Sequence, residues 1–568
     1  MSKKATSSLS LANRPRVGLN LLPLGGMGKV TQNMFLYEIA DEILIIDMGI
    51  GFPDSYMPGV DVLIPDIKPL LKKLEAGKRI VGMILTHGHD DHVGALGYIL
   101  PHLPEFPIYG SALTIGFAAE KLKEFKLKAK MQVVGEKEEF SVGGSKHFRA
   151  VGYHVTHSIP DTRHYLVKTS AGTFYHGTDF KLDPTPVDLK PTDLESISQL
   201  KGQVDLMLVD CLGVEKDEPI PSESTVGAEI ERIMQQTKGK LVVTLMSSHI
   251  HRIQQIVDAA ERHGRKVVFV GRSVEKNVRV AQELSELILP KGIVVSKKKI
   301  DDYRDSQLVI IIAGSQGQEG SSLMRAVFGE HHVVHLGPQD TVVFSASVIP
   351  GNEYNYYGAI DELSRNKIYV LYPAINPKLH RSGHGSQPEQ VKLLDLIKPR
   401  FVMPIGGADR HREKFAELVA KPLGYKDEQI LLPSPGEELN YFNDRVKVVS
   451  ATTLKPQIVD GLGIGDVGPA VLSDRRSLSQ AGIVVVVLPR RGGQILKDKI
   501  EVISRGFVFM KEAGEVVDFI ISEAVQVLAE HEGRKHDEIR RRIEKRLARK
   551  LYKVIKREPM IVVSLIDV

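Results

Sequence analysis

Residues Ile80–His92 read Ile-Val-Gly-Met-Ile-Leu-Thr-His-Gly-His-Asp-Asp-His, an apolar run followed at once by three histidines and two aspartates. The apolar run predicts a buried strand, and the loop after it has the pattern H-x-H-x-D-H. On such a loop His87 and His89 can face one metal ion while Asp91 and His92 face a second. Neutral imidazole suits Zn²⁺, and a carboxylate adds negative charge. A bare H-x-H is more typical of a polar surface turn, whereas the full pattern after a strand predicts a metal site.

Two later segments offer further metal ligands. His157 lies in Val-Thr-His-Ser-Ile-Pro-Asp, and Asp179 lies in His-Gly-Thr-Asp-Phe-Lys. Each residue alone is more typical of a hydrogen-bonded loop side chain. Together with the first loop they complete a shell for two ions, which the two oxygens of Asp179 could bridge. Two ions a few ångströms apart lower the pKa of a shared water and stabilise an in-line displacement at phosphorus, so the predicted chemistry is hydrolysis.

Short apolar runs alternate with helical patterns along most of the chain. This alternation predicts a layered α/β architecture, first around the histidine loop and again from residue 212 to residue 365. Helical patterns are expected at Ile115–Phe125 and Ile253–His263. Strands are expected at Val17–Leu22, Phe35–Glu38, Ile43–Asp47, Ile80–Leu85, Phe148–Val151, Phe174–His176, Leu206–Val209, Lys240–Met246, Lys266–Val270, Leu308–Ala313, Thr341–Ser345, Ile368–Leu371, Ile483–Leu488 and Glu501–Ile503.

The composition is that of a multi-domain globular protein. The 568 residues include 42% hydrophobic and 26% charged residues, with a net charge of +5. A purely apolar run such as Ile483–Leu488 reaches only 6 residues, whereas a membrane-spanning helix needs about 20. The single cysteine, Cys211, excludes an internal disulfide framework and a thiolate metal cluster. We therefore expect a cytoplasmic protein with no secretory signal and no membrane partner.

The positive charge is concentrated near the C-terminus. Between Arg534 and Arg557 there are 12 Lys/Arg and 3 Asp/Glu, so the rest of the chain sums to −4. Apolar residues recur here at helical spacing and predict an amphipathic helix with a basic outer face. That face is either simply solvated or a contact for phosphates or another subunit. In the second case, Arg541 and Arg542 are the candidate phosphate contacts.

Several motifs together resemble the metallo-β-lactamase superfamily and, within it, the beta-CASP nucleases of the ribonuclease J family. They include the histidine loop, the segments around His157 and Asp179, and a series of glycine- and serine-rich motifs that follow. The resemblance covers roughly residues 15 to 568. The further motifs are Gly25–Gly28 with Asn33-Met34, His251-Arg252, Gly271–Ser273, Ala313–Gly317, Ser345–Glu353, His380–Ser386, Asp460–Gly463 and Ile503–Val508.

This resemblance implies a metallo-β-lactamase αββα sandwich with an inserted beta-CASP α/β domain and a small C-terminal α+β domain. The expected boundaries are a flexible leader at 1–15, the lactamase domain at 16–211 and 366–447, the beta-CASP domain at 212–365, a linker at 448–460 and a C-terminal domain for oligomerisation or RNA association at 461–568. It also implies a zinc-dependent 5′-to-3′ exoribonuclease with endonuclease capability, acting in rRNA processing and mRNA decay. The expected partners are RNA, preferably 5′-monophosphorylated, and further copies of the chain in a dimer or tetramer.

The resemblance also assigns roles to residues outside the metal loop. Asp210 matches the acidic residue after the lactamase motifs, and His384 matches the beta-CASP histidine that acts with it to protonate the leaving oxygen. With Asp91, these are the expected catalytic residues. Taken alone, Asp210 would be a turn-capping aspartate and His384 a buried, hydrogen-bonded histidine. The expected substrate contacts are Ser345, Ser347, His380, Ser382, Gly383 and His384, in two loops that suit a phosphate.

One motif departs from the family pattern. The family's His-Gly-Glu, whose histidine ligates the second metal, is replaced here by Gly406-Gly407-Ala408. Glycine has no donor atom, so the second site is expected to be weaker and open to Mn²⁺ or Mg²⁺ in place of Zn²⁺. His411 follows five residues later and is expected to be a surface loop residue. The run after Asp210, Cys-Leu-Gly, is also altered.

Two other functions remain open on sequence alone. Gly406 favours an RNA-binding, inactive subunit that associates with an active relative, although such a subunit would not need the intact histidine loop or His384. A third possibility is a related hydrolase that acts on DNA or on a small phosphoester. The long insert and the basic tail suit a polynucleotide, but composition does not separate RNA from DNA.

Overall fold

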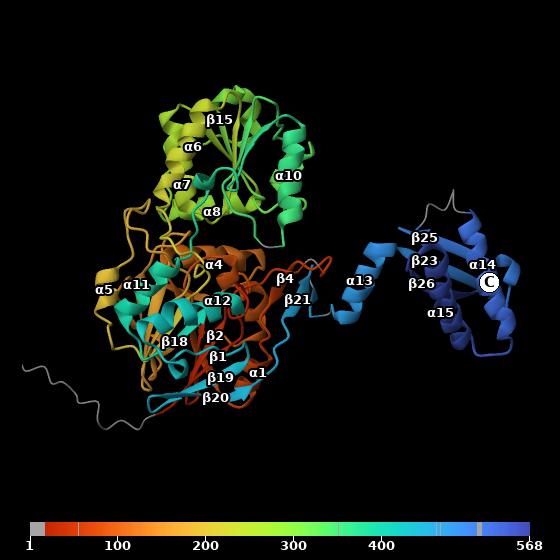
Figure 1. Cartoon of the computed structure of the whole chain (residues 1–568), viewed down its shortest axis with the longest axis horizontal. Helices are drawn as coiled ribbons and strands as arrows, with labels where there is room; N and C mark the ends of the chain where they lie inside the picture. Colours follow the sequence, from red (N-terminus) through yellow and green to blue (C-terminus); the bar gives the residue numbers. More distant parts are fainter. Residues whose placement is uncertain (1–16, 55, 350, 462, 466, 508–513) are drawn as a thin grey trace, which may run out of the picture. The chain divides into compact units, whose positions relative to one another are not determined.

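The computed structural model describes residues 17–54, 56–349, 351–461, 463–465, 467–507 and 514–568 (Figure 1). The predicted leader, 1–15, and parts of three motifs, at residues 350, 462 and 508, lie outside these ranges. The chain divides into two compact units, residues 1–52 with 63–457, and residues 53–62 with 458–568. Among the described residues, no helix is both long enough and apolar enough to cross a membrane.

Two mixed sheets form the centre of the first unit. The first has the strand order β20-β19-β1-β2-β3-β5-β6-β7, and the second has the order β18-β12-β11-β10-β9-β8. The bounds in the first sheet are Arg445–Ala451, Glu437–Phe442, Leu19–Pro23, Phe35–Ile39, Glu42–Ile46, Arg79–Ile84, Pro107–Gly110 and Lys130–Val133. Those in the second are Phe401–Ile405, Leu206–Asp210, Thr173–His176, Arg163–Thr169, Phe148–His154 and Glu139–Ser141.

The inner faces of these two sheets pack against each other. One buried core contains side chains of both, such as Tyr37 and Ile84 from the first sheet and Phe174 and Leu208 from the second. The rings of Tyr37 and Phe174 meet edge to face with centroids 6.2 Å apart. Helices cover the outer faces, so the order of layers is αββα and the expected sandwich is confirmed. These helices are α1 (Lys68–Glu75), α3 (Leu96–Ile99), α4 (Ala112–Glu124), α5 (Leu194–Ser198), α11 (Gln387–Ile397) and α12 (Asp409–Phe415).

A parallel sheet with helices on both faces is inserted between β12 and β18 (Figure 1). Its strand order is β14-β15-β13-β16-β17, with bounds Lys266–Val270, Leu308–Ile312, Leu241–Thr244, Thr341–Phe344 and Tyr369–Leu371. Helices α6 (Ser224–Gln236), α7 (Ile250–Arg262) and α8 (Arg272–Glu283) share one core with the sheet. Helices α9 (Ser322–Val327) and α10 (Glu353–Arg365) share the other. The near-continuous apolar strands follow from burial on both faces.

Strand direction explains how distant residues meet. Strands β9, β11, β12 and β18 of the second sheet all run the same way, because β10 is antiparallel to β9 and β11 while β12 and β18 are parallel to β11. Their carboxyl ends therefore share one edge. The segments that carry His157, Asp179, Asp210 and Gly406 leave the sheet at this edge.

The C-terminal unit is a small α+β structure. Its strand β23 (Ile483–Arg491) pairs with β24 (Gln494–Ile495), β25 (Glu501–Arg505) and β26 (Met560–Asp567). Helices α14 (Gly514–Glu530) and α15 (His536–Ile555) share its core, and α13 (Pro469–Ala481) precedes it. The amphipathic basic helix is confirmed as α15. The final strand β26 was not predicted, since its pairing with β23 is parallel and spans the whole length of the two helices.

Candidate metal centre

The histidine loop begins where β5 ends. His89 directly precedes the short helix α2 (Asp90–Val93), so Asp91 and His92 lie in its first turn. This turn directs the side chains of His87 and His89 to one side and those of Asp91 and His92 to the other. Gly49 allows the close approach, because a Cβ there would lie 1.6 Å from the Asp91 carbonyl oxygen.

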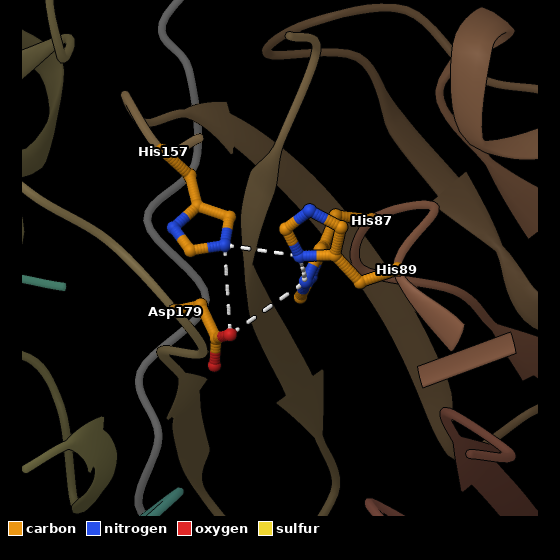
Figure 2. A group of neighbouring side chains, drawn as sticks. All are labelled: His87, His89, His157 and Asp179. Carbon is orange, nitrogen blue, oxygen red and sulfur yellow. Dashed lines mark hydrogen bonds and ion pairs between the residues drawn. The ribbon is translucent and has the colours of Figure 1, made fainter. Parts of the chain in front are cut away.

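Four predicted ligands, which we call the first ligand group, converge in space: His87, His89, His157 and Asp179 (Figure 2). Their donor atoms all lie within 4.8 Å of one another. Nδ1 of His89 is 3.1 Å from Nε2 of His87 and 3.2 Å from Nε2 of His157. Oδ2 of Asp179 is 3.7 Å and 3.6 Å from the same two Nε2 atoms.

Asp179 also faces a second ligand group, made of Asp91, His92 and Asp179 itself. Nε2 of His92 lies 3.6 Å from Oδ1 of Asp179 and 3.6 Å from Oδ2 of Asp91. The two oxygens of Asp179 are thus turned toward different groups, Oδ2 toward the first and Oδ1 toward the second. This is the arrangement of a carboxylate that can bridge two ions.

Hydrogen bonds from behind fix the ligand rings. Nδ1 of His157 donates to the carbonyl of Gly383 at 2.7 Å, which leaves Nε2 free to face the ligand group. Nδ1 of His92 lies 2.7 Å from Oδ2 of Asp47, which also accepts the hydroxyl of Thr86 at 2.8 Å. Sequence reasoning missed Asp47 as a site residue. The available signal was an acidic residue directly after the buried strand β3, here with φ of 59°.

A third cluster adjoins the ligand groups. Nδ1 of His384 is 2.8 Å from Oδ2 of Asp210, and Nε2 of His384 is 3.9 Å from Oδ2 of Asp179. Asp210 is buried at the end of β12, while the His384 side chain is 22% exposed. The carboxylate therefore holds the imidazole so that its other nitrogen points toward the bridging aspartate.

Burial and neighbouring charge divide the histidines into two kinds. Burial lowers the pKa of His87 and His157 well below the usual value and that of His89 to about 3, so these rings are neutral and offer lone pairs. Burial also lowers the pKa of His384, but the carboxylates of Asp210 and Asp179 outweigh it and raise the pKa to about 9. His384 is therefore protonated at neutral pH, next to rings that are not.

The residues predicted to contact phosphate differ in their burial. The Ser347 side chain is exposed, and His380 and Ser382 are half-buried. Ser345 differs, because its fully buried hydroxyl donates to the Leu379 carbonyl at 2.7 Å. That hydroxyl holds the end of β16 to the next loop and does not face an anion, so the prediction for Ser345 is corrected to a structural contact.

Gly406 follows β18 and borders the same cluster. A Cβ built there would lie 3.4 Å from Oδ1 of Asp210 and 3.8 Å from Oδ1 of Asp179, so a side chain at this position would point into the site. His411 does not replace it, and its prediction as a surface residue is wrong. It is buried in α12, where its Nδ1 accepts the Ala408 amide at 3.2 Å and its Nε2 lies 3.4 Å from Glu215.

The donors fit transition-metal ions. Three neutral imidazoles and one carboxylate oxygen converge in the first ligand group, a set typical of zinc. The second ligand group has three donors within the part of the chain that the structure describes, one imidazole and two carboxylates. Its carboxylate content suits harder ions as well.

Comparisons with known proteins agree with this architecture. Three family models match the chain: the beta-lactamase superfamily domain at residues 57–270, the ribonuclease J beta-CASP domain at 238–363 and the ribonuclease J C-terminal domain at 470–568. A solved structure of a protein of unknown function from Enterococcus faecalis V583 shares the fold, with a TM-score of 0.52 at 14% identity. The match covers 74% of this chain and 99% of that one.

Curated relatives are similar over nearly the whole chain. Ribonuclease J of Thermus thermophilus is 37% identical, over 88% of this chain and 86% of that protein. Ribonuclease J of Mycolicibacterium smegmatis is 34% identical over 97% and 98%. Ribonuclease J2 of Bacillus subtilis is 31% identical over 97% and 99%.

The sandwich, its metal-binding loop and the inserted parallel domain define a beta-CASP protein of the metallo-β-lactamase superfamily. The length of the matches and their sequence identity then show the family: the chain belongs to the ribonuclease J family.

Proposed function

We propose that this protein is a metal-dependent ribonuclease that hydrolyses RNA phosphodiester bonds, as a 5′-to-3′ exonuclease with endonuclease capability, in RNA maturation and decay. One observation carries the proposal: two ligand groups share Asp179 and adjoin a protonated histidine held by a carboxylate. The names of the relatives, ribonuclease J, support RNA as the substrate.

Metal binding is assigned to the two ligand groups. The first would hold Zn²⁺ through His87, His89, His157 and Asp179. The second would hold Zn²⁺, Mn²⁺ or Mg²⁺ more weakly through Asp91, His92 and the other oxygen of Asp179. When bound, such ions supply Lewis acidity toward phosphoryl oxygens and lower the pKa of water.

Proton transfer to the leaving group is assigned to His384. The 3′-oxygen that leaves needs a proton, and a histidine with a pKa of about 9 carries one at neutral pH. Asp210 orients the ring through Nδ1, so that Nε2 is the atom that donates. Asp91 takes part in catalysis as a carboxylate of the second ligand group, which lies on the other side of Asp179.

Substrate contacts are assigned to the loops beside His384. Ser347, His380, Ser382 and Gly383 would contact the 5′-monophosphate and the next nucleotide, while the backbone of Gly383 also holds His157. We further propose that the chain forms a homodimer or homotetramer, which a mass measurement in solution tests.

The direct test is cleavage of a 3′-end-labelled, 5′-monophosphorylated RNA by the purified protein with Zn²⁺ or Mn²⁺. A 5′-triphosphorylated RNA and a DNA of the same sequence are the matched controls. We expect stepwise shortening from the 5′ end, with preference for the monophosphate. Preferential cleavage of the DNA would instead identify a DNA-directed hydrolase.

A second candidate function, an inactive RNA-binding subunit, draws its support from Gly406, which leaves the second ligand group with three donors. The intact first ligand group and the Asp210–His384 pair oppose it. Binding of all the RNAs without cleavage of any would identify that function.

A further inference from the structure

Most basic residues of helix α15, together with Arg534 just before it, form two sets. The buried side of the helix is formed by Ile539, Ile543, Leu547 and Leu551, which recur every four residues. The cations of the first set form ion pairs with Glu523, Glu530 and Glu538. The contacts in this set are Arg534 and Arg542 to Glu538, Arg546 to Glu523 and Glu530, and Lys550 to Glu523.

The second set is a row of four cations, Arg541, Lys545, Arg549 and Lys553, which we call the basic stripe. Each member follows a buried residue by two positions, which places it about 200° around the helix, on the side away from the core. No acidic side chain among the described residues pairs with any of them; Arg549 contacts only the backbone oxygen of Lys545. Tyr552, 49% exposed, lies beside the stripe.

The spacing of the basic stripe matches a polyanion. Residues four apart on a helix lie about 6 Å apart along its axis, which is close to the distance between successive phosphates of a nucleic-acid strand. Like charges at this spacing destabilise an isolated helix. A polyphosphate backbone that lies along α15 neutralises them and releases its counterions.

We propose that the basic stripe of α15 is a contact surface for the RNA backbone, distinct from the residues of the metal centre. The inference rests on the proposed function only for the identity of the polyanion. It also corrects one of the sequence-based candidates: Arg541 belongs to the stripe, whereas Arg542 is already paired with Glu538. Since phosphates carry no base identity, the contact is independent of RNA sequence.

The test compares two full-length double variants with equal loss of charge. K545Q/R549Q removes two members of the basic stripe, and R534Q/R542Q removes two cations that are paired with Glu538. Binding is measured against salt concentration without divalent metal, so that no cleavage is needed. The probes are a single-stranded RNA of about 30 nucleotides and an oligonucleotide of about 4, since one compact module covers only ~4–16 nucleotides.

We expect K545Q/R549Q to weaken binding of the long RNA about tenfold at about 0.1 M salt and to reduce the slope of log K against log salt by about 1.4, the value for two lost contacts. Binding of the short RNA and the slope of R534Q/R542Q should stay as in the wild type. Equal changes of affinity and salt slope in both variants would overturn the proposal, because they would show that only the net charge of the protein matters and not the position of the cations.

Two further measurements keep the outcome interpretable. If K545Q/R549Q lowers the midpoint of thermal unfolding, K545R/R549K keeps both charges and should retain the wild-type salt slope. A change of oligomeric mass in K545Q/R549Q with an unchanged slope would identify a subunit contact and reject the RNA contact. Because binding is read without metal, a protein that binds long RNA through the stripe yet cleaves nothing would refute the proposed function and leave this inference standing.

Discussion

The first and second ligand groups share Asp179 and the histidine loop, but the chain surrounds them unequally. The first has three imidazoles and one carboxylate oxygen, the four donors that a zinc ion usually takes. The second has Asp91, His92 and the other oxygen of Asp179, and Gly406 borders the site where a side chain would point inward. The first group therefore has four donors and the second has three, and the fourth is missing because residue 406 has no side chain.

The second ligand group is nevertheless well supported from behind. Asp47 fixes the ring of His92, just as the Gly383 carbonyl fixes that of His157. Such supporting hydrogen bonds are what a working metal site requires. We therefore expect the missing ligand to weaken the binding of a second ion, while these hydrogen bonds hold the remaining ligands in place.

Removing the shared carboxylate should have the largest effect. Asp179→Ala takes an oxygen from both groups and leaves three donors in the first but two in the second, so we expect the loss of the second ion, weaker binding of the first and a fall in kcat of at least about 10⁴-fold. Asp91→Ala is the matched variant: it should also abolish cleavage but bind the first ion with wild-type affinity, since the first ligand group stays intact. Metal content per chain and cleavage of the labelled RNA measure both. Retention of two ions in Asp179→Ala would show that Asp179 does not bridge.

Both variants should still bind RNA, since neither residue is an assigned substrate contact. Loss of RNA binding in Asp91→Ala together with a lowered unfolding midpoint would mean that the substitution damaged the fold and tested nothing about the metal.

The leaving-group acid should come next. Loss of His384 in His384→Ala should lower kcat by about 10²–10⁴-fold. A raised pKa means that the proton is present below about pH 9 and is lost as the pH rises through that value, so activity should fall on this alkaline limb. Asp210→Asn removes the largest cause of the raised pKa. Its alkaline limb should therefore move to lower pH, and an unmoved limb would contradict the assigned pair.

A smaller effect should follow from crowding His157. Gly383→Ala places a Cβ 2.9 Å from the ring of His157, which must shift. We expect first-site zinc affinity to fall about 10–100-fold, the usual effect of losing a supporting contact. Ser382→Ala is the neighbouring control, because the hydroxyl that it removes bonds to the backbone of His384. Equal zinc affinity in both variants would mean that His157 tolerates displacement.

The smallest effect should come from filling the open side of the second ligand group. Gly406→His supplies an imidazole near Asp179 and should tighten the second ion several-fold. Because φ at this position is +69°, any side chain there costs about 1–2 kcal/mol of stability. Gly406→Ala carries the same backbone cost without a donor, so it should lower the unfolding midpoint equally and leave metal affinity unchanged. Tighter binding of the second metal ion in both variants would mean that the added imidazole is not the cause.

Local patterns made much of the site predictable. The strand before His87, the H-x-H-x-D-H spacing and the position of Asp179 each follow from a few adjacent residues, and the structure brings those ligands together. Half of the strands in these two sheets, β1, β2, β3, β5, β9, β11 and β12, were predicted within a few residues for the same reason, because alternation and apolar runs are local signals. The other half, β6, β7, β8, β10, β18, β19 and β20, were not predicted.

The features that were missed depend on contacts between distant segments. Asp47 acts through His92, which lies 45 positions away, and Ser345 is buried by the loop that ends at Leu379, 34 positions away. His411 is buried by contacts with residues distant in the sequence, such as Glu215, which the adjacent residues do not indicate. Strand β26 pairs in parallel with a strand on the far side of two helices. Such pairings carry no sequence signal of their own.

The most direct test of the expected difference in metal affinity between the two ligand groups is a titration of the metal-free wild-type protein with Zn²⁺, or with Zn²⁺ followed by Mn²⁺. The number of bound ions and the cleavage of 5′-monophosphorylated RNA are measured together. We expect one tightly bound equivalent of metal that supports little cleavage, and then a weaker second equivalent with which cleavage rises. Full cleavage at one equivalent, or two equivalents bound with equal affinity, would contradict this expectation.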